Sequence, residues 1–322
     1  MMRLVLVSSR SFGSAVSIGE EILRREGFTI RRVKPEKRPL DAFKMQSIVS
    51  SEKPDVIVCG AEPINEAVLK ASQKLRLVMK HGVGIDNIDL ESAASLKIPV
   101  AIAPGTNTEA VADFTVAVML VLLRSICQAS NSTKRGEWKR YIGNELGKLT
   151  VGIVGTGRIG ISVMERLHGF RTRILAYDIF HNEELESKYN LKYVDLDELL
   201  KRSDIVTLHV PLTDGTSRMI GHKQLEIMKK GAYLINLARG GLIDEKALYE
   251  HLKSKRIAGA AIDVFSTEPP QKSPLLKLDN VLATPHLAAY TYEAMERMDR
   301  LCGEIIVNFF KGYKAKVSPY MV

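Results

Sequence analysis

The chain has 322 residues, of which 45% are hydrophobic and 26% are charged, and its net charge is +9. This length allows two domains with cores of their own, and the composition is typical of soluble globular proteins rather than of disordered, fibrous or membrane-spanning ones. The basic residues are scattered and no nucleic-acid motif accompanies them. We therefore attribute the charge to a solvated surface and expect no nucleic-acid partner.

Cysteine usage and apolar runs bear on where the protein resides. Cys59, Cys127 and Cys302 show neither CxxC spacing nor neighbouring histidines, so we expect reduced thiols and no metal site. The amino-terminal apolar run is too short for a signal peptide, and the stretch 114–123 is too short to cross a membrane. We expect a cytoplasmic protein that does not associate with membranes.

Strands alternate with helices in the first third of the chain. Helical patterns separate the apolar runs, and a glycine loop at 81–89 follows the fourth run. The strands are predicted at 3–8, 29–33, 55–59, 75–80 and 99–103, and the helices at 17–26, 40–50, 65–72 and 90–96. This alternation is typical of βαβ units and predicts a parallel sheet.

Pro104 and Gly105 interrupt the alternation, and an apolar helix over 109–123 is expected to cross into a second domain. The polar segment 131–147 contains the only tryptophan, and we interpret it as a connection or as an arm that contacts a partner subunit. The pattern then resumes, with strands predicted at 150–154, 173–177, 203–210, 232–237, 257–265 and 280–284 and helices at 195–201, 223–228 and 244–252. A last helix, 293–311, is expected to return to the first domain. The predicted fold class is α/β with parallel sheets.

A glycine motif lies between one of these strands and a helix that begins near Ile159. Gly155 allows a tight turn, Gly157 lets a pyrophosphate approach the backbone, and Gly160 lets the helix pack against the strand. Asp178 ends the next strand, where a carboxylate would accept hydrogen bonds from an adenosine ribose and repel a 2′-phosphate. This arrangement predicts NAD binding, in preference to NADP. A glycine turn that binds no ligand is the alternative.

Further polar residues follow the predicted strands, and ligands of open parallel sheets bind at that edge. Reduction of a 2-keto acid by NADH needs a cation for the carboxylate, an acid for the carbonyl oxygen, and a group that keeps this acid protonated. Arg239, His286 and Glu268 suit these three tasks. Taken singly, Arg239 could form a surface ion pair and Glu268 could be a plain loop residue, and His209 is as good an acid as His286.

Five segments together resemble the D-isomer-specific 2-hydroxyacid dehydrogenases. They are GTGRIG with Asp178, LHVPLT (208–213), MKKGAYLINLARGGLIDEKAL (228–248), GAAIDVFSTEPP (259–270) and NVLATPHLAA (280–289). The resemblance implies that Arg239, Glu268 and His286 are catalytic. It implies cofactor contacts from Gly155, Gly157, Arg158, Ile159, Gly160, Asp178, His209, Val210, Pro211, Thr213, Ala238 and Asp263. It implies substrate contacts from Lys80, Val83, Gly84, Asn107 and Arg239.

The same resemblance implies an organisation for the whole chain. Two Rossmann-like domains are expected, with the active site in the cleft between them. The substrate domain would comprise residues 1–103 and be completed by 290–322, and the NAD-binding domain would comprise 104–289. A homodimer formed through the NAD-binding domain is also implied.

Within the family, VGIDNIDLESAA and PGTNTEAVADFTVAVML are most similar to the D-3-phosphoglycerate dehydrogenase branch. Lys80 matches a cation on the phosphate side, but the loop at 59–64 carries Glu62 where that branch often has an arginine. The chain ends at Val322, so we expect no regulatory domain. We predict oxidation of 3-phosphoglycerate to 3-phosphohydroxypyruvate, a step of serine biosynthesis. The alternatives are a hydroxypyruvate or glyoxylate reductase, a D-lactate-type dehydrogenase, and a non-catalytic NAD-sensing protein.

Overall fold

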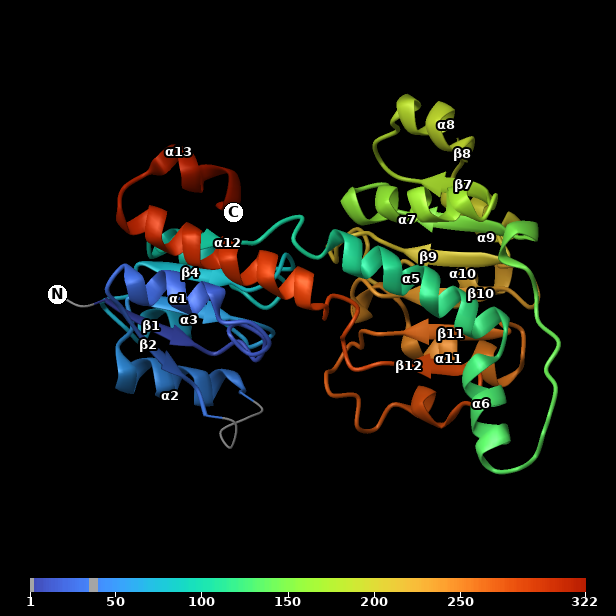
Figure 1. Cartoon of the computed structure of the whole chain (residues 1–322), viewed down its shortest axis with the longest axis horizontal. Coiled ribbons are helices and arrows are strands. Elements are labelled where there is room, and N and C mark those ends of the chain that lie inside the picture. Colours follow the sequence, from blue (N-terminus) through green and yellow to red (C-terminus); the bar gives the residue numbers. More distant parts are fainter. Residues whose placement is uncertain (1–2, 35–39) are drawn as a thin grey trace. The chain divides into compact units, whose positions relative to one another are not determined.

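The computed structural model describes residues 3–34 and 40–322, and the chain divides into two compact units (Figure 1). Unit 1 comprises Met1–Asn107 and Tyr290–Val322, and unit 2 comprises Thr108–Ala289. The first boundary thus falls a few residues after the one expected from the sequence. Each unit is an α/β layer structure around a parallel sheet, in agreement with the predicted fold class.

Unit 1 contains a five-stranded parallel sheet with the strand order β2-β1-β3-β4-β5. β3 and β4 are buried along their whole length, which requires helices on both faces. The strands are β1 (Arg3–Val7), β2 (Phe28–Arg32), β3 (Val56–Cys59), β4 (Leu77–Lys80) and β5 (Val100–Ala101).

The helices of unit 1 cover both faces of its sheet. The long helix α12 (Tyr292–Phe310) packs beside α1 (Ile18–Arg25) and buries Met298, Cys302 and Ile306 in one core. A second core lies under α2 (Ala42–Glu52), α3 (Glu66–Lys70) and α4 (Leu90–Ser95). The chain ends with α13 (Lys314–Val317) and a 3-10 turn, η5 (Ser318–Tyr320).

Unit 2 contains a seven-stranded parallel sheet with the order β12-β11-β10-β9-β6-β7-β8. Its helix α5 packs against α7, and their apolar side chains form one of the two cores of this unit. The strands are β6 (Thr150–Val154), β7 (Arg173–Tyr177), β8 (Leu191–Tyr193), β9 (Ile205–Leu208), β10 (Tyr233–Asn236), β11 (Gly259–Ile262) and β12 (Val281–Ala283). The helices are α5 (Thr108–Leu123), α6 (Ile126–Lys134), α7 (Arg158–Gly169), α8 (Glu183–Tyr189), α9 (Leu196–Arg202), α10 (His222–Ile227) and α11 (Glu245–Lys253), with 3-10 turns η2 (Leu146–Lys148), η3 (Gly240–Leu242) and η4 (Pro274–Lys277).

Several elements of unit 2 depart from the sequence prediction. α8 and β8 were not predicted, because α8 (EELESKY) is rich in charge and β8 (LKY) has only three residues. Asn182 nevertheless caps α8 by accepting a hydrogen bond from Glu184 N. The segment 131–147 is not purely a connection, because α6 runs to Lys134 and η2 follows at Leu146. Between them, a long loop runs along unit 2 (Figure 1).

No single helix within residues 3–34 and 40–322 has the length and apolarity needed to cross a membrane. The pair α5 and α6 satisfies those criteria only when the two helices are joined across a 60° bend. Half of the 16 residues of α5 are buried and six of these belong to a core of unit 2, which accounts for its apolar sequence.

Candidate active site

The predicted site residues of unit 2 follow parallel strands whose ends are in register. Val154, Leu208, Asn236, Ile262 and Ala283 are consecutive partners across the sheet. The segments that follow these strands therefore leave the sheet at one edge. They carry Gly155, His209, Arg239, Asp263 and His286, and β7 adds Asp178 to the same edge.

The glycine loop after β6 is built around close contacts that exclude side chains. Gly155 has a φ of +100°, and a Cβ there would lie 2.6 Å from the carbonyl oxygen of His209. A Cβ on Gly160 would lie 2.1 Å from the carbonyl oxygen of Gly155, so this glycine allows α7 to start against the turn. A Cβ on Gly157, by contrast, would meet nothing within 4 Å. The protein itself leaves the space beside Gly157 open, which fits a pyrophosphate at the start of α7.

Asp178 lies against this loop, at the end of β7. Its Oδ2 accepts hydrogen bonds from Thr156 N (2.6 Å) and Thr156 Oγ1 (3.1 Å), and its Oδ1 accepts one from Phe180 N (3.1 Å). Burial alone would raise the pKa of Asp178, but these hydrogen bonds outweigh it and hold the pKa below the ordinary value of 3.8. The carboxylate is therefore ionised at neutral pH and has a fixed orientation.

His209 follows β9 and is neutral. Burial lowers the pKa of His209 from 6.5 to about 4. Its Nε2 lies 3.0 Å from Thr207 Oγ1. A ring that stays neutral through the physiological range is a poor proton donor. Burial therefore distinguishes His209 from the more exposed His286, whereas the sequence alone did not distinguish them.

His286 and Glu268 form a pair, with His286 Nδ1 2.9 Å from Glu268 Oε2. Their side chains are 47% and 32% exposed. Glu268 Oε1 also accepts a hydrogen bond from Phe265 N (3.1 Å). Burial would raise the pKa of Glu268, but the hydrogen bond to His286, the charges of His286 and Arg239, and the Phe265 N–H together lower it below 4.5. Glu268 is thus an ionised partner for the imidazole ring.

Asp263 fixes the loop that carries His286. Its carboxylate accepts hydrogen bonds from Thr284 Oγ1 (2.6 Å), Leu287 N (2.8 Å) and Ala288 N (2.9 Å), and its carbonyl accepts one from His286 N (2.9 Å). Asp263 is 1% exposed. His286 adopts a positive φ of 53°, which few non-glycine residues adopt and which this clamp sustains. The sequence suggested only a cofactor contact for Asp263, and its role in holding the loop was missed.

Arg239 is brought beside the same segment by the glycine that follows it. A Cβ on Gly240 would lie 2.0 Å from the carbonyl carbon of Phe265, so only glycine permits this approach. Arg239 accepts a hydrogen bond at its carbonyl from Asn236 Nδ2 (2.8 Å), and its Nη1 donates to Ala238 O (2.7 Å). The structure therefore brings together the three side chains that the sequence singled out for catalysis.

The other predicted cofactor residues of unit 2 lie at the same sheet edge. Arg158 is exposed and Ile159 is half-buried in the first turn of α7. Val210, Pro211 and Thr213 follow His209, with Thr213 N donating to Thr216 Oγ1 (2.8 Å). Ala238 is half-buried next to Arg239. Their contact with a cofactor stays a prediction.

The predicted substrate residues Lys80, Val83, Gly84 and Asn107 belong to unit 1. Lys80 is 8% exposed, and its Nζ donates hydrogen bonds to Gly60 O (2.5 Å) and Asn87 Oδ1 (2.6 Å). Val83, Gly84 and Asn107 are half-buried loop residues. Their contact with a substrate also stays a prediction.

Glu62 and Lys80 share a partner in unit 1. Glu62 is 7% exposed and accepts a hydrogen bond from Gly60 N (2.6 Å), the residue whose carbonyl Lys80 holds. Both side chains therefore help to fix the loop after β3. The sequence had indicated only that Glu62 occupies a position where related enzymes often have a cation.

Unit 1 contains another histidine–carboxylate pair, which was not predicted. His81 Nε2 lies 2.7 Å from Asp299 Oδ1, and His81 Nδ1 lies 2.8 Å from Ser11 Oγ. The side chains of His81 and Asp299 are 0% exposed. Asp299 Oδ2 also accepts from Gly13 N (2.7 Å), so this group connects α12, β4 and the loop after β1. The spacing of 218 residues between His81 and Asp299 left no local signal in the sequence.

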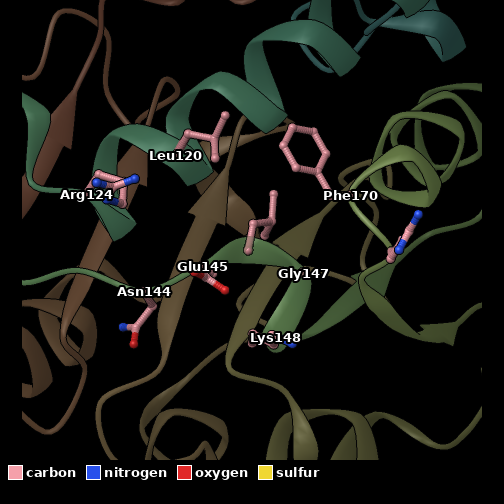
Figure 2. A pocket seen from close by; sticks show the side chains of 9 residues that line it. Leu120, Arg124, Asn144, Glu145, Gly147, Lys148 and Phe170 are labelled. Carbon is pink, nitrogen blue, oxygen red and sulfur yellow. The ribbon is translucent and has the colours of Figure 1, made fainter.

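Two pockets of unit 2 lie outside the candidate site. One has a volume of about 350 Å³ and is lined by residues at the end of α5, around η2 and at the end of α7 (Figure 2). The other, of about 570 Å³, lies by α10 and α11. Neither is lined by Arg239, Glu268, His286 or Asp178. Within residues 3–34 and 40–322, no group of three or more His, Cys, Asp or Glu side chains is placed to hold a metal ion.

Comparison with known proteins identifies the family. A model described as "D-isomer specific 2-hydroxyacid dehydrogenase, NAD binding domain" matches residues 116–288. The chain is 44% identical over 285 residues to D-3-phosphoglycerate dehydrogenase of Methanocaldococcus jannaschii, covering 83% of this chain and 54% of the relative. It is 43% identical over 268 residues to glyoxylate reductase of Korarchaeum cryptofilum, covering 81% and 80%.

A solved structure gives the same result. D-lactate dehydrogenase from Aquifex aeolicus, crystallised with NAD and lactic acid, has a TM-score of 0.88 and 29% identity, covering 99% of both chains. The chain spans about half the length of the phosphoglycerate dehydrogenases that it matches. The predicted family and the predicted NAD cofactor are confirmed. The chain belongs to the D-isomer-specific 2-hydroxyacid dehydrogenases, and residues 116–288 match the NAD-binding domain of that family.

Proposed function

We propose that the protein is an NAD-dependent oxidoreductase that interconverts a D-2-hydroxy acid and its 2-keto acid. The observation that carries this proposal is the His286–Glu268 pair, 2.9 Å apart, with Arg239 beside it at the sheet edge that also holds the glycine loop. A proton donor, its carboxylate partner and a carboxylate-binding cation are the groups that keto acid reduction requires of the protein.

The hydrogen bonds assign a role to each nitrogen of His286. Glu268 engages Nδ1, which leaves Nε2 to exchange a proton with the substrate oxygen. In reduction, protonated His286 donates this proton, and the ionised Glu268 stabilises the imidazolium that must form beforehand. In oxidation, neutral Nε2 accepts the proton. Bound NADH or NAD supplies or accepts the hydride.

Arg239 binds the substrate carboxylate in this proposal. A guanidinium can donate two parallel hydrogen bonds to a carboxylate, which orients the neighbouring carbonyl as well as holding the charge. The segment of unit 1 that contains Val83 and Gly84, together with Asn107, is proposed to contact the same substrate.

For the substrate, two candidates are supported by different observations. Two relatives named D-3-phosphoglycerate dehydrogenase, at 44% and 43% identity, support 3-phosphoglycerate and a role in serine biosynthesis. The contacts of Lys80 favour an unphosphorylated acid such as glyoxylate or hydroxypyruvate. Its ammonium already binds Gly60 O and Asn87, and the ionisable Glu62 lies in the same loop. Relatives named glyoxylate reductase match over about 80% of their own length.

We also propose that the protein is a homodimer formed through unit 2. Ile126 on α6 and Trp138 and Ile142 on the following loop are 48%, 75% and 100% exposed. Large apolar side chains on an extended segment are typical of a surface that is covered in an assembly. Light scattering on the protein and on a Trp138→Ser, Ile142→Ser variant tests this, and a wild type that is monomeric at micromolar concentration contradicts it.

The decisive experiment for the activity follows NADH oxidation by the purified protein with a panel of 2-keto acids. The panel contains 3-phosphohydroxypyruvate, hydroxypyruvate, glyoxylate, pyruvate and 2-ketoisocaproate. A preference for the phosphorylated acid that Lys80→Gln abolishes supports 3-phosphoglycerate. A preference for glyoxylate or hydroxypyruvate supports the second candidate. If no keto acid is reduced although NADH binds, the enzymatic proposal is wrong and a non-catalytic NAD-binding protein is favoured.

A further inference from the structure

Tyr193, at the end of the short edge strand β8, is linked to the carboxylate of Asp178 through one intervening side chain. Its hydroxyl donates to Thr156 Oγ1 (3.0 Å), and Thr156 Oγ1 donates to Asp178 Oδ2 (3.1 Å). Thr156 is 8% exposed and Tyr193 is 9% exposed. Buried hydrogen bonds of this kind are stronger and more directional than exposed ones.

The donors and acceptors in this series of hydrogen bonds can be assigned in only one way. An ionised carboxylate can only accept, so the single hydroxyl hydrogen of Thr156 points to Asp178. The oxygen of Thr156 must then accept, and Tyr193 is its donor. The ring of His181 stacks on that of Tyr193, with centroids 4.5 Å apart and planes 14° apart, which covers the tyrosine from the other side.

These contacts leave Asp178 little freedom to move. Thr156 fills Oδ2 with two donors, one from its backbone and one from its hydroxyl. Phe180 N occupies one direction of Oδ1. Rotation of the carboxylate would therefore break bonds at both oxygens. Hydrogen bonds to a charged group are stronger than those between neutral groups, so such a rotation is costly.

We propose that Tyr193 and Thr156 are positioning residues that set the preference of this site for NAD over its 2′-phosphorylated form, by holding Asp178 where a 2′-phosphate would have to lie. A mobile carboxylate could swing away from a phosphate and relieve the repulsion between the two negative charges. A carboxylate held by the Tyr193–Thr156 chain cannot. The inference rests on the proposed function, since it takes Asp178 as the residue that meets the adenosine ribose.

The experiment compares Tyr193→Phe, which removes only the hydroxyl, with wild type and with Tyr189→Phe. Tyr189 is a matched control because it is also buried in unit 2 and its hydroxyl donates to Glu165 Oε1 (2.7 Å), away from Asp178. The quantities measured are the Kd values of NADH and NADPH by calorimetry and the kcat/KM values for both cofactors with one keto acid. We expect the NADPH-to-NADH ratio of Kd to fall about tenfold in Tyr193→Phe, through tighter NADPH binding, and to stay unchanged in Tyr189→Phe.

A double-mutant cycle distinguishes an effect transmitted through the hydrogen bonds of Tyr193 and Thr156 from a general loosening of the fold. Thr156→Val keeps the backbone donor and the shape but removes the hydroxyl, so it should lower the ratio as Tyr193→Phe does. Adding Tyr193→Phe to Thr156→Val should then change nothing further. Additive effects, or a ratio within twofold of wild type in Tyr193→Phe while Asp178→Ser abolishes the preference, would overturn the proposal. Because cofactor binding is measured directly, the outcome does not depend on finding a keto acid substrate, and a failed enzymatic proposal is recognised separately.

Discussion

Two histidine–carboxylate pairs, one taken from each unit, have similar geometry but different surroundings; a third pair, His251 and Glu226, lies 3.2 Å apart in unit 2. His81 and Asp299 in unit 1 lie 2.7 Å apart with both side chains fully buried. His286 and Glu268 in unit 2 lie 2.9 Å apart and are 47% and 32% exposed. His81 is bonded at both ring nitrogens, whereas His286 is bonded at Nδ1 alone among the residues that the structure describes.

The comparison teaches that the pair itself does not define a catalytic centre. A ring whose two nitrogens are both engaged in the interior can connect elements but has no position from which to exchange a proton with a ligand. A ring held at one nitrogen, and open to solvent at the other, can do so. The surroundings of the pair therefore distinguish a structural histidine from a candidate acid.

The largest effect is expected from His286→Asn. Loss of the general acid should lower kcat for keto acid reduction by about 10²- to 10⁴-fold, while the Kd of NADH changes little. Steady-state kinetics and calorimetry measure the two quantities. His222→Asn, at an exposed histidine on α10, is the matched control and should leave kcat unchanged. Near-normal turnover in His286→Asn would remove His286 from the mechanism.

His81→Leu should show the opposite pattern. It removes the histidine partner of buried Asp299, which still accepts from Gly13 N, and loss of a hydrogen-bond partner from a buried polar group costs about 1–3 kcal/mol of the free energy of unfolding. Urea denaturation measures this loss, and kcat below the transition should fall by less than tenfold. A variant with unchanged stability and a hundredfold lower kcat would place His81 in the chemistry and erase the distinction between the two pairs.

Glu268→Gln should have an intermediate effect. The amide still accepts a hydrogen bond from His286 Nδ1, but the negative charge that stabilises the imidazolium is gone. We expect kcat for reduction to fall about tenfold, which corresponds to about 1.4 kcal/mol of lost stabilisation of the charged ring. The pH at which reduction is half-maximal should move lower, because the ring holds its proton less well without the neighbouring negative charge. An unchanged pH profile would show that Glu268 does not act on the protonation of His286.

His209 should affect the pH dependence of stability rather than turnover. Because its pKa is about 4 in the folded protein and about 6.5 when unfolded, the unfolded state binds the extra proton first as the pH falls. Its contribution lowers stability between pH 6.5 and 4, by about 1–3 kcal/mol. His209→Gln should therefore lose less stability than wild type across this interval, as thermal unfolding at paired pH values would show. An identical slope would mean that His209 is not held neutral.

The short motifs of unit 2 could be predicted from the sequence because their function depends on local order. The Gly155–Gly160 turn must follow a strand and start a helix, and Arg239 must precede a glycine that approaches Phe265. Such requirements leave a pattern within a few residues. The predicted strand ends then indicated the position of the candidate site, since ligands bind at the edge where parallel strands end.

Other parts left no such pattern. β8 has three residues and α8 is mostly charged, so neither has the periodicity on which prediction depends. His81 and Asp299 meet only after the chain has folded back along α12, and the hydrogen bond from Tyr193 to Thr156 spans 37 positions. The function of Asp263 as a clamp was also hidden, because an aspartate after a strand is equally compatible with a ligand contact.

The contacts of Asp263 have a consequence for protein engineering. Three donors on the 284–288 segment converge on this one carboxylate, so the segment and Asp263 form a single exchangeable module. Transplanting 284–288 from a relative would carry His286 but not the anchor that sets its backbone. A chimera should therefore exchange Asp263, directly after β11, together with the segment after β12, although 21 to 25 positions of the chain separate the carboxylate from its three donors.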